Sequence, residues 1–276
     1  MHILPTGLSI VLHLPATGDE YFTLRRRHLA SHLAQHKVAS ILLMHPYYGH
    51  RRSSTQASSS LEYVHQMSEQ CLGAVLESNA VVNWLTRICG FHGNVVFTGI
   101  SFGGSMAALA SLYCGVKHAV VAFLPANGPK DAYVHGVLKY TVPFHLYENM
   151  VLEEAFEELI AHLSITNRKN GKDMVDALLS PMDIAKAARE LCHAHSNNPL
   201  SPTVPQRVYI QLSAQNDRYV PITRAMHLYE HMSMLPGMMH KECVCVEGGH
   251  VSAIVLGSRG VYVDSIVRAI RLLGEC

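Results

Sequence analysis

Short runs of consecutive apolar residues alternate along this chain with longer stretches in which apolar residues recur at helical spacing. The runs lie at residues 9–14, 38–44, 95–100, 118–124, 208–213 and 242–247. An uninterrupted apolar run fits a strand that is buried on both faces, as in a parallel sheet between two layers of helices. The alternation therefore predicts an α/β fold with a mostly parallel, twisted sheet and helices on both faces.

One segment, residues 126–205, breaks this alternation. It contains helical patterns at residues 153–163, 174–179 and 184–193, separated by turn-rich stretches. A chain of this length usually forms one α/β domain. We therefore expect a single domain, residues 1–276, into which the segment is inserted as a helical cap.

The amino-acid composition indicates which binding partners and which compartment to expect. Lys and Arg number 22 against 21 Asp and Glu, which gives a formal net charge of +1. Because there is no excess of positive charge and no long basic run, we expect no nucleic-acid partner. The seven cysteines are odd in number and scattered, which favours reduced thiols inside the cell over a disulfide framework. With no apolar run of about 18 residues and no signal peptide in view, we expect a soluble, intracellular protein.

The pentapeptide Gly99-Ile100-Ser101-Phe102-Gly103 is a G-x-S-x-G motif between a predicted strand and a predicted helix. A serine on such a sharp turn takes strained backbone angles, and side chains two positions before and after it would clash with the neighbouring strand and helix. The turn would raise the Ser101 hydroxyl at the carboxyl end of the sheet, beside a helix N-terminus. The motif predicts Ser101 as a nucleophile; the alternative is a tight turn in which the serine caps the helix.

Two further residues follow later strands in the order that a Ser, acid, His triad requires. Asp217 comes shortly after one apolar run, and His250 follows the next run, behind a pair of glycines. The carboxyl ends of parallel strands meet at one edge of a sheet, where ligands bind in open α/β sheets. We therefore predict Ser101 as the nucleophile, His250 as the general base and Asp217 as the acid of an acyl-transfer reaction.

A carbonyl under attack also needs backbone N–H groups that stabilise its developing negative charge. The first is predicted to be that of Phe102, immediately after the nucleophile. The second should come from the loop after the strand at residues 9–14, where Pro15 has no N–H to offer. Ala16 is therefore the predicted second donor, with Thr17 as the alternative.

At this point the chain resembles a known family, the α/β-hydrolase domain-containing protein 18 family of the α/β-hydrolase superfamily. The matching strings are residues 14–19 (LPATGD), 25–27 (RRR), 45–51 (HPYYGHR), 76–78 (LES), 84–85 (WL), 98–104 (TGISFGG) and 247–253 (EGGHVSA). The resemblance runs almost from end to end, and the strings around Tyr47 and His250 are specific.

The resemblance implies an α/β-hydrolase fold and a Ser–Asp–His hydrolase of carboxylic esters, with lipid acyl esters as the favoured substrate class. It also implies a mitochondrial association for some members, although no targeting signal is visible in this sequence. The members we compare carry a long segment before the first strand, which does not appear here. We therefore expect a sheet that is shortened at the N-terminus, with the strand at residues 38–44 near an edge.

One string raises the question of a metal site. His227 and His231 belong to an H-x-x-E-H string, a zinc-peptidase signature that places two imidazoles one helical turn apart. No compelling third ligand follows it, so we interpret it as a solvated helix face. Cys243 and Cys245 have no partner pair at zinc-finger spacing. We predict no metal and no cofactor.

Charged residues near the predicted strand at 38–44 have open roles. Glu77 lies mid-helix with no cation at helical spacing, so it either braces the loop around Tyr47 or is solvated. For Arg51 and Arg52 we favour surface ion pairs over contact with an anionic head group.

The alternative to an enzyme is a hydrolase-fold protein that has lost its chemistry and serves as a binding or scaffold module. We favour the enzyme because all three triad residue types are present.

Apolar residues of the inserted segment either line an acyl pocket or pack on the core: Tyr133, Val137, Leu138, Tyr140, Phe144 and Leu146. We expect a small-molecule or lipid ester as substrate, and the cap is a candidate for peripheral membrane contact. The sequence leaves the oligomeric state open.

Overall fold

In the part of the chain that the structure describes, six strands form a single sheet in the spatial order β2-β1-β3-β4-β5-β6, and each neighbouring pair is parallel. The strands are β1 (Ser9–Leu14), β2 (Val38–Leu42), β3 (Val95–Ile100), β4 (His118–Phe123), β5 (Arg207–Ala214) and β6 (Met238–Val246). They belong to a computed structural model that describes residues 7–63, 65–142, 144–145, 170–197, 204–255 and 257–274. The predicted parallel sheet is confirmed, and β2 forms one edge of it, as expected for the strand at residues 38–44.

Helices connect most successive strands. The α-helices are α1 (Thr23–Arg25), α2 (Ser31–Gln35), α3 (His65–Asn83), α4 (Phe102–Leu112), α7 (Gly171–Leu179), α8 (Ile184–Asn197), α9 (Ile222–Met232), α10 (His250–Val255) and α11 (Arg259–Gly274). Wider π-helical turns are η1 (Arg26–Ala30), η3 (Trp84–Ile88) and η4 (Asp131–His135), and narrower 3₁₀ turns are η2 (Gly49–Arg51), η5 (Val137–Thr141) and η7 (Ser180–Met182). Across the described part of the chain, each helix is too short or too polar to span a bilayer.

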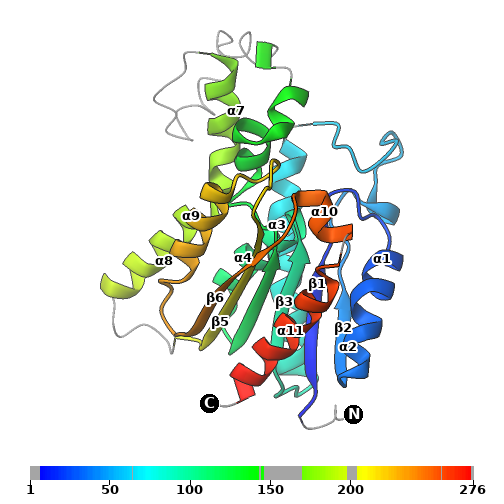
Figure 1. The fold of residues 1–276 in the computed structure, drawn as a ribbon, viewed down its shortest axis with the longest axis vertical. Helices are drawn as coiled ribbons and strands as arrows, with labels where there is room; N and C mark the ends of the chain where they lie inside the picture. Colours follow the sequence, from blue (N-terminus) through cyan, green and yellow to red (C-terminus); the bar gives the residue numbers. More distant parts are fainter. Residues whose placement is uncertain are drawn as a thin grey trace.

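These helices cover the sheet in two layers (Figure 1). On one face, α2 and α11 pack against the strands, while α3, α4, α8 and α9 form the layer on the other face. Alternate residues of a strand point to opposite layers: on β1, Ile10 and Leu12 belong to one hydrophobic core and Val11 to the other. All six residues of β1 are buried, so a strand between two helical layers shows a nearly continuous apolar run in the sequence.

All six strands run in the same direction, so their carboxyl ends lie along one edge of the sheet. In Figure 1 this is the upper edge, where α10 follows β6 and where α7 stands above the sheet. At this edge β3 ends at Ile100, β5 at Ala214 and β6 at Val246. The fold therefore brings together three segments that are far apart in the sequence.

The periodicity leaves features of two helices undetermined. The helical pattern at residues 61–89 predicts one long helix and leaves a break near Gly73 open, and α3 continues through this position. A Cβ at Gly73 would lie 2.6 Å from Cγ of Pro46, so this glycine lets the loop after β2 pack directly against the helix. The other helix is α10, whose six residues are too few to show a helical period.

The described part of the segment at residues 126–205 contributes to two places. The turns η4 and η5 dock on the loop after β5, where the Val137 N–H donates to the carbonyl oxygen of Arg218 at 3.0 Å. In contrast, α8 packs against α4 and α9 in the helical layer. The helical pattern at residues 153–163 and Leu146 lie outside the described residues, so the division into one domain with an inserted cap stays a prediction.

Candidate active site

Ser101 occupies the sharp turn between β3 and α4. Its backbone angles are φ 54° and ψ −117°, a positive-φ conformation that costs a non-glycine residue roughly 1–3 kcal/mol. Two glycines make the turn possible: a Cβ at Gly99 would lie 2.3 Å from the carbonyl carbon of Gly103, and a Cβ at Gly103 would lie 2.3 Å from the carbonyl oxygen of Leu14. The expected clashes with the following helix and the neighbouring strand are therefore confirmed.

His250 is the first residue of α10, behind two glycines that let the chain turn. Gly248 has φ +93°, and a Cβ there would lie 2.6 Å from Ser252 Oγ. That hydroxyl accepts the N–H of Gly249 at 2.8 Å, which holds the start of the helix in place. The turn directs the imidazole toward the end of β3, and His250 Nε2 lies 2.7 Å from Ser101 Oγ.

Asp217 lies in the loop between β5 and α9, and its side chain is 3% exposed. Its Oδ2 is 2.6 Å from His250 Nδ1, and its Oδ1 accepts the N–H groups of Tyr219 and Val220 at 2.8 and 2.9 Å. A carboxylate at Nδ1 requires the ring proton on that nitrogen, which leaves Nε2 to accept the Ser101 O–H. The structure thus brings Ser101, His250 and Asp217 into one hydrogen-bonded line.

Two contacts around this line do not follow from the sequence motifs. The ring of Tyr219 stacks on the imidazole of His250, with the centroids 5.0 Å apart and the planes at 29°. The N–H of Asn216 donates to the carbonyl oxygen of Gly248 at 3.0 Å, which joins the loop after β5 to the loop after β6. The only sequence signal for Tyr219 is its position two residues after the predicted acid.

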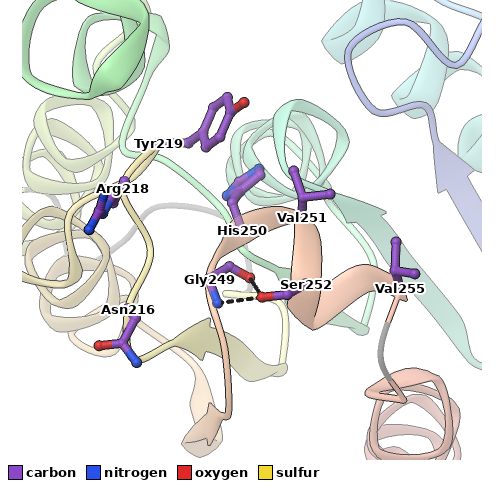
Figure 2. A pocket seen from close by; sticks show the side chains of 8 residues that line it. All are labelled: Asn216, Arg218, Tyr219, Gly249, His250, Val251, Ser252 and Val255. Carbon is purple, nitrogen blue, oxygen red and sulfur yellow. Dashed lines mark hydrogen bonds between the residues drawn. The ribbon is translucent and has the colours of Figure 1, made fainter.

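An open depression of about 590 Å³ adjoins His250, within the usual range for a small-molecule site. Its lining residues are Asn216, Arg218, Tyr219, Gly249, His250, Val251, Ser252 and Val255. In Figure 2, Val251 and Val255 point the same way from α10, and Tyr219 lies on the other side of the imidazole. The depression therefore presents apolar side chains next to the ring that contacts Ser101.

The predicted oxyanion donors lie in two different segments. Phe102 is the first residue of α4, so its N–H has no acceptor within the helix and lies at the positive end of the helix dipole. Ala16 is half-buried in the loop after β1. That loop lies against the first turn of α4, because a Cβ at Gly103 would also lie 2.7 Å from the carbonyl oxygen of Pro15. The roles of both N–H groups stay predictions.

A comparison with known protein families identifies the family to which this chain belongs. A family model described as alpha/beta hydrolase domain containing 18 matches residues 4–272 of the chain. The chain belongs to this family. The resemblance carried by the sequence motifs is thereby confirmed, and membership in a hydrolase-fold family supports a hydrolase.

Solved structures with similar folds come from several organisms, and three of them illustrate the likeness. An esterase from Pyrococcus furiosus is 13% identical, with a TM-score of 0.56 over 95% of this chain and 82% of its own. An enol-lactonase from Burkholderia xenovorans is 11% identical, with a TM-score of 0.53 over 96% and 92%. An α/β hydrolase from a Penicillium species is 13% identical, with a TM-score of 0.53 over 97% and 90%. At these identities the likeness shows the fold alone.

In this member of the alpha/beta hydrolase domain containing 18 family, the H-P-Y-Y-G-H-R segment is held by ion pairs. Arg51 makes two hydrogen bonds to Glu77, at 2.7 and 2.6 Å, and a third to the carbonyl oxygen of Met44 at 2.7 Å. Arg52 pairs with Glu20 at 3.2 Å. The expected surface ion pairs are confirmed, and Glu77 braces the segment.

The H-x-x-E-H string does not present two available imidazoles. His231 Nδ1 donates to the backbone carbonyl oxygen of His227 at 2.8 Å, and its Nε2 accepts from Arg189 Nη1 at 2.9 Å. Both ring nitrogens of His231 are therefore engaged. Among the residues that the structure describes, no three His, Cys, Asp or Glu side chains gather as metal ligands would.

Proposed function

We propose that this chain is a serine hydrolase that cleaves carboxylic esters through an acyl-enzyme on Ser101. One observation carries the proposal: hydrogen bonds run unbroken from Asp217 through His250 to Ser101, at 2.6 and 2.7 Å. A module that only binds would need neither this line nor a serine held at positive φ. The family and the fold support a hydrolase, and this row of hydrogen bonds supports the proposal that it is a serine hydrolase.

Acylation begins when Ser101 Oγ attacks the carbonyl carbon of the ester. The hydroxyl proton passes to His250 Nε2, and the resulting imidazolium is stabilised by the carboxylate of Asp217. The tetrahedral intermediate then collapses, the C–O bond to the leaving alcohol breaks, and His250 returns the proton to that oxygen. Ser101 is left as an ester of the acyl group.

The negative oxygen of the tetrahedral intermediate needs donors that are already in place. The N–H groups of Phe102 and Ala16 are proposed to fill this role, and the positive end of the α4 dipole adds to it. Deacylation repeats the sequence with water: His250 takes a proton from the water, the hydroxide oxygen attacks the acyl carbon, and Ser101 leaves with the proton from His250. A carboxylic acid is released and the serine is restored.

The substrate is proposed to be a lipid acyl ester, as the family resemblance implies. The depression beside His250 supports an apolar group, because Val251 and Val255 line it and are 57% and 71% exposed. These two valine side chains on the six-residue helix α10 are exposed to solvent, so an acyl chain can pack against them. On a series of p-nitrophenyl esters, kcat/KM should therefore rise from acetyl to long-chain esters.

The cap residues that the sequence singles out differ in how deeply they are buried. Tyr133 and Phe144 are partly buried and pack against the hydrophobic core. Tyr140 is 80% exposed, and Leu146 lies outside the described residues. Their part in an acyl pocket, and contact of the cap with a membrane, stay predictions.

Activity-based labelling tests the proposal directly. The full chain is treated with a fluorophosphonate probe, and the modified residue is identified by mass spectrometry of its peptides. We expect the label on Ser101, no label in Ser101→Ala, and a loss of turnover on the order of 10⁶ in that variant. Ser111→Ala is the matched control, because Ser111 lies on α4, the helix that follows Ser101, and its hydroxyl is bonded to the carbonyl oxygen of Ala108. A wild-type chain that takes no label and hydrolyses none of the esters would contradict the proposal.

A further inference from the structure

A buried histidine lies behind the proposed oxyanion site and takes no part in the proton transfers described above. His45 follows β2 and is 1% exposed. Its Nε2 lies 3.1 Å from the carbonyl oxygen of Pro15. Its ring meets that of Phe102 edge-on, with the centroids 5.1 Å apart and the planes at 67°. One side chain therefore contacts both segments that are proposed to supply the oxyanion donors.

The contact with Pro15 determines the direction of a second group. The carbonyl oxygen of Pro15 and the N–H of Ala16 belong to one peptide unit, which is planar and trans, so the two point in opposite directions. The same oxygen is confined by α4, since a Cβ at Gly103 would lie 2.7 Å from it. A group that holds the Pro15 oxygen therefore also sets the direction of the Ala16 N–H.

The environment of His45 makes its imidazole a neutral donor. Burial, together with the positive charges of Arg25 and Arg51, lowers the pKa of His45 to about 3. A neutral imidazole carries a single N–H. Because the carbonyl oxygen of Pro15 can only accept, that proton lies on Nε2, and the hydrogen bond persists throughout the neutral pH range.

We propose that His45 is a positioning residue for the oxyanion site: its Nε2–H holds the Pro15–Ala16 peptide so that the Ala16 N–H points at the developing oxyanion, while its ring supports Phe102. This inference rests on the proposed function. The oxyanion exists only in the tetrahedral intermediate and the transition states that flank it, so His45 acts on kcat and leaves KM nearly unchanged.

Two amide variants separate the hydrogen bond from the bulk of the ring. The side-chain NH₂ of His45→Gln reaches the position of Nε2, whereas that of His45→Asn falls short, near the position of Nδ1. We expect His45→Asn to lower kcat by about 10- to 100-fold at constant KM, less than the 10²–10³ that follows the outright loss of a donor. His45→Gln should keep most of the wild-type kcat.

A trifluoromethyl ketone provides the readout that a purely structural role would not move. It forms a tetrahedral adduct with a nucleophilic serine, so its affinity should fall in His45→Asn by the same factor as kcat. His13→Asn is the matched control. His13 is also 1% exposed, and its Nε2 bonds to Ser40 Oγ on β2 at 3.0 Å. We expect this control to lower Tm while kcat stays within about threefold of the wild type.

Three results would overturn the inference: equal kcat in His45→Asn and wild type, a fall in kcat that the ketone affinity does not follow, or an equal fall in His13→Asn. Each requires an active wild-type chain. A wild-type chain without esterase activity and without fluorophosphonate labelling overturns the proposed function itself. The failure of the positioning role and the failure of the enzyme assignment are therefore distinguishable in one set of measurements.

Discussion

Two pairs of loops meet at the carboxyl edge of the sheet, and they are held in opposite ways. In the acid–base loops, residues 215–221 and 247–250, the backbone holds side chains. Two N–H groups bind the Asp217 carboxylate at 2.8 and 2.9 Å, and a turn with positive φ at Gly248 directs the ring of His250. The groups proposed to react are side chains, and the main chain is their support.

In the oxyanion loops, residues 15–22 and 43–56, side chains hold the backbone. Arg25 donates to two carbonyl oxygens at the ends of β1 and β2, at 2.8 and 2.7 Å, and His45 donates to that of Pro15 at 3.1 Å. Here the group proposed to act is a backbone N–H, so the supporting groups are buried side chains. The chemistry of a loop therefore decides which part of it must be held: the side chain or the backbone.

The largest effect is expected in the acid–base loops. In Asp217→Asn, the amide NH₂ can face His250 Nδ1, which drives the ring proton to Nε2 and removes the acceptor for the Ser101 hydroxyl. We expect kcat on a p-nitrophenyl ester to fall by about 10⁴ while Tm changes little. Asp264→Asn, at an exposed position on α11, is the control. A loss smaller than about tenfold would mean that the carboxylate does not set the tautomer.

The first test of the oxyanion loops measures the free energy of unfolding. Arg25 is 5% exposed and binds Asp19 at 2.5 Å. Arg25→Met would leave the Asp19 carboxylate and the carbonyl oxygen of Leu43 without their donor, and the carbonyl oxygen of His13 with only the N–H of Leu43. The loss should lower the free energy of unfolding by about 3–5 kcal/mol. Urea titrations measure the change. Arg26→Met, one residue later at an exposed position, should stay within about 0.5 kcal/mol of wild type. Equal losses in the two variants would show that burial of Arg25 is irrelevant.

The same contrast explains how far the sequence alone could reach. Ser101, Asp217 and His250 carry distinctive functional groups, and their order after three strands predicts a triad that the structure brings within hydrogen-bonding distance. An N–H group is present on every residue except proline, so Ala16 could be chosen only by excluding Pro15. No residue pattern reveals which way that peptide faces.

The fold shows the same division between local and spatial information. The six apolar runs predict the six strands because each strand is buried between two helical layers. The contact between His45 and Pro15 depends instead on β2 lying beside β1. The stacking of Tyr219 on His250 depends on the direction of a ring. Both are properties of the assembled sheet edge, which a one-dimensional pattern does not contain.

The stability of the oxyanion side of the sheet edge should also depend on pH, because β1 and the loop after β2 carry buried neutral histidines. Burial and the charge of Arg25 lower the pKa of His13 to about 3, whereas in the unfolded chain a histidine titrates near 6.5. The unfolded state therefore binds the proton first, and stability is lost as the pH falls below about 6.5. From pH 7 to pH 5 this residue should account for about 2 kcal/mol of that loss.

Urea titrations at the two pH values, on wild type and His13→Asn, measure this contribution. At pH 7 the variant should have a lower free energy of unfolding than the wild type. Between pH 7 and pH 5 its free energy of unfolding should fall by about 2 kcal/mol less than that of the wild type, because an amide does not titrate. Parallel losses in both proteins would show that the acid sensitivity arises elsewhere.

The smallest effect is expected at the exposed brace of the oxyanion loops. The side chains of Arg51 and Glu77 are 38% and 41% exposed, so water and salt screen the pair despite its two short hydrogen bonds. A double-mutant cycle with Arg51→Gln and Glu77→Gln should give a coupling free energy of about 0.2–1 kcal/mol, and less in 1 M NaCl. The buried brace at Arg25 and this one thus differ in burial rather than in the type of charge pair. A coupling of several kcal/mol that persists in 1 M NaCl would contradict this prediction. It would show that the exposed pair stabilises the loop as much as the buried Arg25 does, so burial would not explain the difference between them.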